Sequence, residues 1–216
     1  MSASRESLEE RFKRMDSIEE DLHRKGYLAL AGVDEAGRGP LAGPVVAAAC
    51  ILDPRKPILG LNDSKKLSEK RRKALFEKIR EEALAYKIKA VPPARIDRIN
   101  ILEATKEAMT LALQELDVKP DFILLDAITL KAFPPEMQMS LVKGDTRSNT
   151  IAAASILAKV SRDRYMQEMD ELYPDYGFSR HKGYGTKAHY EALDALGPSP
   201  IHRKSFLRKW AEERKL

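Results

Sequence analysis

The chain has 216 residues, 43% of them hydrophobic and 33% charged, a balance typical of a globular protein with a substantial core. No apolar run approaches the roughly 18 residues that cross a bilayer, which excludes a membrane-spanning helix. The charged N-terminal stretch lacks the hydrophobic region of a secretory signal, so we expect a cytoplasmic protein. The net charge of +5 is compatible with an anionic partner, and the single cysteine excludes an internal disulfide.

The first 26 residues are expected to form an amphipathic helix, because hydrophobic residues between Leu8 and Leu22 recur at steps of three and four. Such a helix lays its apolar face on a domain. We therefore divide the chain into an N-terminal helical extension, residues 1–26, and one compact domain, residues 27–216. No repeat, low-complexity stretch or long linker divides the second segment further.

The rest of the chain alternates short apolar runs with amphipathic segments. Apolar runs bounded by Gly and Pro are typical of buried strands and predict strands over residues 27–33, 45–52, 85–91, 122–126 and 137–142. Hydrophobic residues at helical spacing predict helices over residues 69–82, 96–116, 149–172, 187–195 and 204–215. This order predicts an α/β fold in which helices cover both faces of a mixed sheet.

Three acidic sites lie at the ends of predicted strands or in the turns just after them: Asp34 with Glu35, Asp126, and Asp145. Ligands bind at the carboxyl ends of strands in open α/β sheets, so we expect these carboxylates to converge. Their mutual repulsion then requires cations. Hard divalent ions favour oxygen ligands, whereas the Cys and His spacing of a zinc site is absent. The sequence therefore predicts Mg²⁺ or Mn²⁺ as the cofactor.

Each acid has an ordinary structural explanation when it is taken singly. Asp126 is compatible with a cap on the next segment, and Asp145 with a turn residue after Gly144. The joint placement of the acids at the ends of apolar strands is what favours a functional site.

A glycine-rich turn, Gly37-Arg38-Gly39-Pro40, follows the first acidic pair. Its glycine spacing superficially resembles a dinucleotide-binding motif, but that motif needs a helix to begin at the turn. Residues 45–52, just after Pro44, are instead predicted to form a strand, which disfavours a nucleotide cofactor. Glycine lets a backbone approach a ligand without a Cβ in the way. The peptide groups of this turn are thus able to hydrogen-bond a ribose hydroxyl.

Together these motifs resemble bacterial ribonuclease HII, a type 2 ribonuclease H family, over roughly residues 28–206. The resemblance rests on six ordered motifs: Asp34-Glu35-Ala36-Gly37-Arg38-Gly39-Pro40, Asp63-Ser64-Lys65-Lys66-Leu67, Leu125-Asp126-Ala127, Lys143-Gly144-Asp145, the apolar run Ile151 to Val160 with Arg162-Asp163, and His181-Lys182-Gly183-Tyr184-Gly185-Thr186. Several motifs in one order are far more specific than a single acid pair.

The resemblance implies the ribonuclease H fold, a five-stranded mixed sheet flanked by helices, here with extra C-terminal helices. It implies a metal-dependent endoribonuclease that hydrolyses the RNA strand of RNA–DNA hybrids and incises at single ribonucleotides embedded in duplex DNA. Residues 27–216 then form the type 2 ribonuclease H catalytic domain. Two metal ions about 4 Å apart suit an in-line attack that leaves 5′-phosphate and 3′-hydroxyl ends.

By the same resemblance, four residues are the catalytic and metal-binding carboxylates: Asp34, Glu35, Asp126 and Asp145. Gly37, Arg38 and Gly39 read the 2′-hydroxyl through their backbone, and Tyr184 stacks on the sugar beside the ribonucleotide. The sister family, ribonuclease HIII, is disfavoured because it usually has lysine at the position of Arg38. It also has an added N-terminal domain, which residues 1–26 are too short to form.

Basic residues near these motifs are candidate phosphate contacts: Lys65, Lys66, Lys143, Lys159, Arg162 and Lys182. As a set they are expected to follow the backbone of a duplex, although each alone is equally compatible with a solvated surface charge. The four histidines lack metal-ligand spacing. Only His181, which is close in sequence to Tyr184, is a weak candidate for a substrate contact.

Two other classes of function stay open from the residues alone. A DNA nuclease would use the same carboxylates, and a noncatalytic module would bind the hybrid without cutting it. The intact acidic set argues against the module, because unneeded carboxylates repel the phosphate backbone. We expect a monomer whose partners are RNA–DNA hybrids and DNA duplexes containing ribonucleotides, with no membrane association and no organic cofactor.

Overall fold

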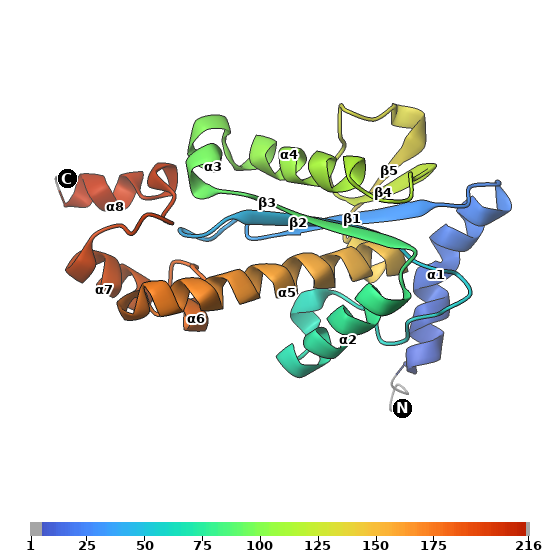
Figure 1. The fold of residues 1–216 in the computed structure, drawn as a ribbon, viewed down its shortest axis with the longest axis horizontal. Helices are drawn as coiled ribbons and strands as arrows, with labels where there is room; N and C mark the ends of the chain where they lie inside the picture. The colour runs from blue at the N-terminus through green and yellow to red at the C-terminus, as the bar shows by residue number, and fades with distance from the viewer. Residues whose placement is uncertain (1–5, 215–216) are drawn as a thin grey trace, which may run out of the picture.

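The computed structural model describes residues 6–214 and contains one mixed sheet of five strands in the order β3-β2-β1-β4-β5 (Figure 1). The strands are β1 (Leu30–Ala36), β2 (Val45–Ile51), β3 (Ala85–Val91), β4 (Phe122–Asp126) and β5 (Gln138–Leu141). β1 pairs antiparallel with β2 and parallel with β4, β2 pairs antiparallel with β3, and β4 pairs parallel with β5. The predicted five-stranded mixed sheet is confirmed, and β1 is its central strand.

Helices cover both faces of this sheet (Figure 1). One layer holds α3 (Pro93–Ile99) and α4 (Ile101–Gln114), and the other holds α2 (Glu69–Glu82) and the long α5 (Asn149–Leu172). The C-terminal helices α6 (Phe178–His181), α7 (Lys187–Leu196) and α8 (Arg208–Glu213) gather at the end of the molecule opposite α1 (Leu8–Arg24). Within residues 6–214, no helix combines the length and the apolar character that are needed to cross a membrane.

The single helix predicted over residues 96–116 is wrong, because the chain breaks between α3 and α4. Asn100 has a positive φ of 67°, which ends α3. Its side-chain oxygen accepts hydrogen bonds from the backbone N–H groups of Leu102 and Glu103 and so caps the start of α4. The hydrophobic periodicity that continues across Asn100 conceals the break in the sequence. The segment predicted as a helix over 204–215 likewise divides into a short 3-10 turn, Lys204–Phe206, and α8; residue 215 lies outside the described residues.

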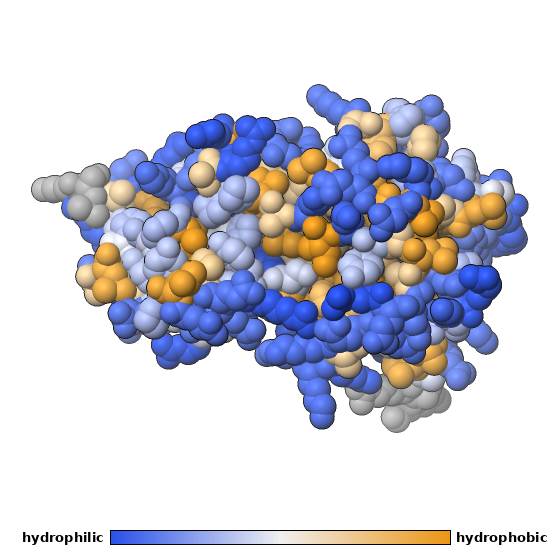
Figure 2. Space-filling model, viewed as in Figure 1, coloured by the Kyte–Doolittle hydropathy of each residue, from blue (hydrophilic) through white to orange (hydrophobic). Residues whose placement is uncertain are grey.

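Alternation along the strands divides the apolar core between the two faces of the sheet. On β2, Ala47 and Ala49 face α4, whereas Val46, Ala48 and Cys50 face α5 and α2. Figure 2 shows hydrophilic residues over much of the outward surface and patches of hydrophobic residues along the band between the two helical layers. The mainly alanine surface of α5 against the sheet lets the helix lie close to it.

Gly32 in the middle of β1 permits the closest of these approaches. A Cβ at this position would collide with the backbone of Thr150 at the start of α5. Glycine here therefore fixes how near the first turn of α5 lies to the central strand.

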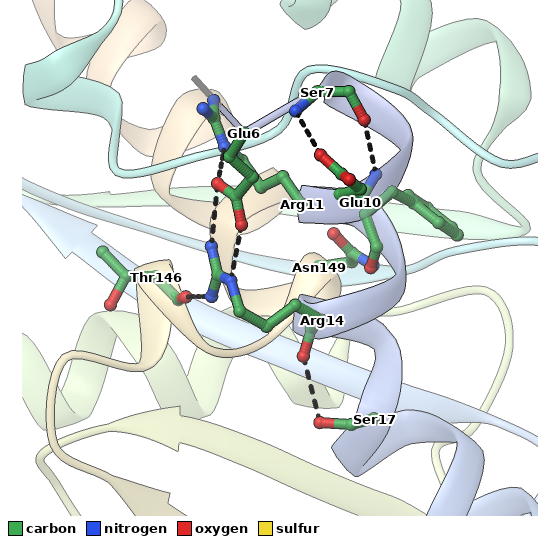
Figure 3. A network of polar contacts seen from close by, with 9 residues as sticks. Glu6, Ser7, Glu10, Arg11, Arg14, Ser17, Thr146 and Asn149 are labelled. Atoms are coloured by element: carbon green, nitrogen blue, oxygen red, sulfur yellow. Dashed lines mark hydrogen bonds and ion pairs between the residues drawn. The ribbon is translucent and has the colours of Figure 1, made fainter. Parts of the chain in front are cut away.

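The N-terminal helix α1 is joined to the turn that precedes α5. Figure 3 shows Arg14 of α1 reaching Thr146, whose carbonyl oxygen accepts a hydrogen bond from Nη1 of Arg14 at 3.1 Å. Glu19 of α1 is buried, and its Oε1 accepts hydrogen bonds from the N–H of Thr150 at 3.1 Å and from the hydroxyl of Ser148 at 2.7 Å. The carboxylate thus caps the N-terminus of α5, where a negative group is favourable.

We predict that Gly32→Ala destabilises the protein by about 3 kcal/mol, because the added methyl group forces α5 away from β1. For a domain of this size that cost lowers the melting temperature by about 6–12 °C. Circular dichroism on heating measures it. Gly60→Ala is the control, since a Cβ there meets open space and only the positive φ of 95° is strained. Equal losses in the two variants would contradict the packing argument.

Candidate active site

A cavity of about 760 Å³ lies at the carboxyl ends of β1 and β4 and is lined by all four predicted carboxylates. Asp34 and Glu35 come from β1, Asp126 ends β4, and Asp145 lies in the 3-10 turn Gly144–Thr146. The first strand lies three residues further along the chain than the predicted 27–33. Its pairing with β2 continues to Ala36, which places the acidic pair inside the strand rather than in a turn after it.

Asp126 is hydrogen-bonded to the turn that carries Asp145. Its Oδ1 accepts a hydrogen bond from the backbone N–H of Gly144 at 2.8 Å. The neighbouring residue in the turn, Asp145, is thereby held at the same end of the sheet. This hydrogen bond joins the end of β4 to a turn that follows β5, and so links acids from distant parts of the sequence.

Burial, together with neighbouring negative charge, raises the pKa of three of these groups. Burial raises the pKa of Asp34 well above its ordinary value, and the nearby Glu35 and Asp126 add to the shift. Burial also raises the pKa of Glu35, although the Arg38 guanidinium, 3.4 Å from Oε1 of Glu35, opposes this. Burial, with Asp63 and Asp126, raises the pKa of Asp145 to about 6. The site is therefore short of positive charge.

The donor chemistry of the site fits a hard divalent cation. Oε2 of Glu35 is buried and has no hydrogen-bond partner, so one carboxylate oxygen is available as a ligand. As the side chains stand, no three His, Cys, Asp or Glu residues within residues 6–214 are placed to hold one metal ion.

The glycine-rich turn forms the neighbouring wall of the cavity through Gly37, Arg38 and Gly39. Buried Arg203 holds it from behind, donating hydrogen bonds to the carbonyl oxygens of Gly37 at 2.5 Å and Arg38 at 2.9 Å. Nε of Arg203 also donates to the carbonyl of Gly43 at 2.9 Å. Burial and the nearby Arg162 lower the pKa of Arg203 to about 9, so it still carries its charge at neutral pH.

These hydrogen bonds determine which way the peptide N–H groups of the turn point. The described chain contains no cis peptide bond, and in a trans peptide the C=O and the following N–H point in opposite directions. Because the carbonyls of Gly37 and Arg38 face Arg203, the N–H groups of Arg38 and Gly39 face away from it. Two consecutive donors are thus presented on the side of the turn away from the buried guanidinium.

Tyr184 is 44% exposed and lies on the same cavity wall. A Cβ built on Gly39 would be 3.8 Å from Cε1 of Tyr184, which places the ring beside the glycine-rich turn. The guanidinium carbon of Arg162 lies 6.0 Å from the ring centroid, within range of a cation–π interaction. The cavity therefore combines carboxylates, free peptide donors and an exposed aromatic ring.

Comparison with known proteins gives this arrangement a family. The family model for ribonuclease HII matches residues 31–209, most of the chain. The chain belongs to the ribonuclease HII family. It is therefore a metal-dependent nuclease that cleaves the RNA strand of RNA–DNA hybrids. Family membership thus favours this activity over the DNA nuclease and the noncatalytic module that the residues alone left open.

Similar sequences and structures agree with this assignment. The chain is 54% identical over 197 residues to ribonuclease HII of Desulfitobacterium hafniense strain Y51, covering 91% of this chain and 75% of the relative. It is 53% identical over 195 residues to that of Enterococcus faecalis, covering 90% and 76%. Among solved structures, ribonuclease H2 of Pyrococcus horikoshii OT3 superposes with a TM-score of 0.71 at 30% identity, covering 87% of this chain and 99% of that one.

Two further structures show what related proteins bind. Ribonuclease HII of Archaeoglobus fulgidus, solved as a complex with PCNA, has a TM-score of 0.67 at 30% identity, covering 82% of this chain and 94% of that chain. A ribonuclease HIII solved with Mn²⁺ has a TM-score of 0.60 at 20% identity, covering 81% of this chain and 65% of that chain, a likeness of fold alone.

The structure separates the six predicted phosphate contacts. Lys65 and Lys159 line the cavity, although Nζ of Lys159 also pairs with Asp163 at 2.7 Å. Lys66 and Lys143 are exposed outside the cavity lining. Lys182 is half-buried, and its Nζ donates to the carbonyl oxygen of Ser179 at 2.7 Å.

Arg162 departs most from the expectation of a phosphate contact. It is 1% exposed, and its guanidinium donates hydrogen bonds to the carbonyl oxygens of Ala42, Pro44 and Lys182 at 3.0–3.1 Å. A Cβ at Gly37, whose φ is 94°, would collide with this side chain. Arg162 therefore packs beneath the glycine-rich turn and positions it.

Five cavity residues had no predicted role: Ala36, Ser64, Ile101, Ser155 and Phe206. The two serines lie inside motifs that carried the family resemblance, and the hydroxyl of Ser155 donates to that of Ser64 at 3.0 Å. Motif membership was thus a signal for both. Ile101 and Phe206 carried no comparable signal, because a hydrophobic residue at helical spacing is usually a core residue.

We predict that Arg203→Lys lowers the free energy of unfolding by about 2–4 kcal/mol. Lysine keeps the charge but loses the planar fork that bonds three carbonyls, and each lost hydrogen bond to a charged group costs about 1.5–3 kcal/mol. Urea denaturation measures the change. The exposed Arg208→Lys is the control and should stay within about 0.5 kcal/mol of the unmodified protein. A similar small effect in Arg203→Lys would show that the turn does not depend on this side chain.

Proposed function

We propose that the enzyme incises duplex DNA at single embedded ribonucleotides as well as cleaving continuous hybrids. Asp34, Glu35, Asp126 and Asp145 act as its metal ligands. The observation that carries the proposal is the shared cavity, in which these carboxylates face a turn with two outward peptide N–H groups. A cleavage centre and a group that senses one sugar hydroxyl thus lie side by side.

The carboxylates would hold two divalent ions, Mg²⁺ or Mn²⁺. When bound, such ions activate a water for in-line attack and stabilise the leaving 3′-oxygen, which gives 5′-phosphate and 3′-hydroxyl ends. Buried Asp34 and the unpartnered Oε2 of Glu35 supply ligands that are already desolvated. Their charge is unfavourable without a cation, so the same residues that bind the ions also disfavour phosphate in their absence.

The 2′-hydroxyl oxygen is the acceptor that distinguishes a ribonucleotide from its neighbours. The N–H groups of Arg38 and Gly39 are suited to donate to it, because Arg203 orients their peptides away from itself. A backbone sensor of this kind does not read the base. The proposed incision therefore depends on the sugar and is independent of sequence.

Tyr184 is proposed to stack on the deoxyribose that follows the ribonucleotide. Its exposed ring lies next to Gly39, beside the proposed sensor of the 2′-hydroxyl. A flat apolar surface there favours a sugar without a 2′-hydroxyl. Lys65 and Lys159, which line the cavity, are the proposed phosphate contacts nearest the cleavage centre.

The central test is cleavage of a duplex that contains one ribonucleotide, with the product ends mapped by mass spectrometry. We predict cleavage of the phosphodiester bond on the 5′ side of the ribonucleotide, only in the presence of Mg²⁺ or Mn²⁺. The products carry 5′-phosphate and 3′-hydroxyl ends. An all-DNA duplex of the same sequence is the control. Cleavage of that control at an equal rate, or turnover after chelation of divalent ions, would contradict the proposal.

Asp34→Asn is predicted to lower the cleavage rate by more than about 10³-fold, because the amide is a much poorer metal ligand. The melting temperature should not fall. Burial and Glu35 raise the pKa of Asp34, so a negative charge on this side chain costs stability in the folded protein, and a neutral amide removes that cost. Full activity in a folded Asp34→Asn variant would remove Asp34 from the site.

For Tyr184, we predict that Phe keeps most of the activity on the single-ribonucleotide duplex, whereas Ala loses about tenfold through lost stacking. Initial rates at limiting substrate measure both. Tyr86→Ala, on the distant strand β3, controls for general loss of a tyrosine. Unchanged rates in both Tyr184 variants would rule out the sensing role.

A further inference from the structure

Three histidines to which the sequence gave no firm role lie together directly behind Tyr184. His189 is fully buried and His202 is 4% exposed, and their Nε2 atoms are 2.9 Å apart. The ring of His181 stacks on that of His189, with centroids 4.3 Å apart and an interplanar angle of 15°. The cluster packs against Phe178 rather than opening into the cavity.

Hydrogen bonds assign the proton on each ring. The backbone N–H of Ser199 donates to Nδ1 of His202 at 2.9 Å, so that nitrogen carries the lone pair. In a neutral ring the proton of His202 is then on Nε2, which donates to Nε2 of His189. His189 in turn carries its proton on Nδ1, which donates to the carbonyl oxygen of Tyr184 at 2.9 Å. A backbone amide can only donate, so this direction is fixed.

The third histidine holds the other side of the same loop. The N–H of Gly183 donates to Nδ1 of His181 at 3.2 Å, and the opposite nitrogen of the ring therefore donates to the carbonyl of Tyr176 at 2.8 Å. Burial lowers the pKa of all three histidines, that of His189 to about 4. Neutral rings are thus what the protein contains at pH 7, in agreement with the proton assignment.

Two imidazoles hydrogen-bond the backbone around Tyr184. The backbone on each side of Tyr184 is held by an imidazole, at the N–H of Gly183 and at the carbonyl of Tyr184 itself. The ring itself is 44% exposed and lies beside the edge of the turn, with the Arg162 guanidinium carbon 6.0 Å from its centroid. The N–H of Tyr184 also donates to the carbonyl of His181 at 2.9 Å, and the carbonyl of Tyr184 also accepts from the N–H of Thr186 at 2.8 Å. The position of the ring therefore depends on its backbone, and His189 is the side chain that bonds the carbonyl of Tyr184.

We propose that His189 and His202 are positioning residues for Tyr184 and thereby determine the preference for an RNA-to-DNA junction. Their directed hydrogen-bond chain runs from the Ser199 amide to the Tyr184 carbonyl. It holds the ring at the position needed to stack on the deoxyribose that follows the ribonucleotide. This inference rests on the stacking role proposed above for Tyr184.

The test compares two substitutions that keep different nitrogens of His189. Asn places an amide nitrogen near the position of Nδ1 and retains the donor to Tyr184, whereas Gln places it near Nε2 and loses that donor. The measured quantity is the ratio of cleavage rates on a single-ribonucleotide duplex and on a continuous RNA–DNA hybrid. We expect His189→Gln to lower this ratio about tenfold, a free-energy change of about 1.4 kcal/mol, and His189→Asn to keep it within about twofold.

A double-mutant cycle separates positioning from a merely structural role. In a Tyr184→Ala background, His189→Gln should lower the ratio no further, because the ring on which it acts is absent. Independent, multiplied losses would overturn the inference. If Tyr184→Ala leaves the ratio unchanged, the stacking role and this inference both fail. If Tyr184→Ala lowers the ratio and His189→Gln does not, only this inference fails.

A measurement on the unmodified protein keeps the proposal testable where a variant does not fold. Long-range proton–nitrogen NMR correlations report which ring nitrogen carries the proton. We expect Nδ1–H in His189 and Nε2–H in His202 at pH 7. The opposite tautomer in either ring, or a charged ring, would break the chain to Tyr184 and overturn the inference.

Discussion

The parallel pairing of β1 with β4 is the constraint on which the site depends. It brings the carboxyl ends of two strands that are some ninety residues apart in the chain to one edge of the sheet. β1 carries Asp34 and Glu35 near its end and β4 ends at Asp126, so the pairing brings carboxylates from both strands together. Burial, together with the neighbouring carboxylates, raises the pKa of Asp34 and Glu35. The hydrophobic sheet stabilises a cluster that is unfavourable by itself and suited to cations.

Around that cluster, the recognition that we propose uses the backbone of the turn rather than long side chains. Buried side chains hold this backbone by hydrogen bonds to its carbonyl groups. Arg203 bonds the carbonyls of the turn, and Arg162 bonds carbonyls in the segment just after it. Imidazoles bond the backbone of the loop that carries Tyr184. A charged guanidinium thus lies beneath the turn, and neutral imidazoles lie beside the loop that carries the Tyr184 ring.

Much of this could be predicted from the sequence, because its signals are local. Apolar runs gave the five strands, and acids at their ends gave a set of carboxylates that the fold brings into one cavity. The break at Asn100 was missed, since hydrophobic periodicity continues across it and only a positive φ shows it. For Arg162, the sequence shows the charge but not the environment. Its charge indicates a phosphate contact, whereas its burial beneath Gly37 depends on packing between segments more than a hundred residues apart.

The attachment of α1 has a consequence for where the cooperative unit of this enzyme ends. The helix contacts the carbonyl of Thr146, one residue after Asp145, and caps α5 through Glu19. Side-chain hydrogen bonds therefore join α1 to the segment that starts α5, across the division expected at residue 26. Fraying of α1 would loosen the segment that carries Asp145, so α1 and the turn Gly144–Thr146 should exchange their amide protons as one unit.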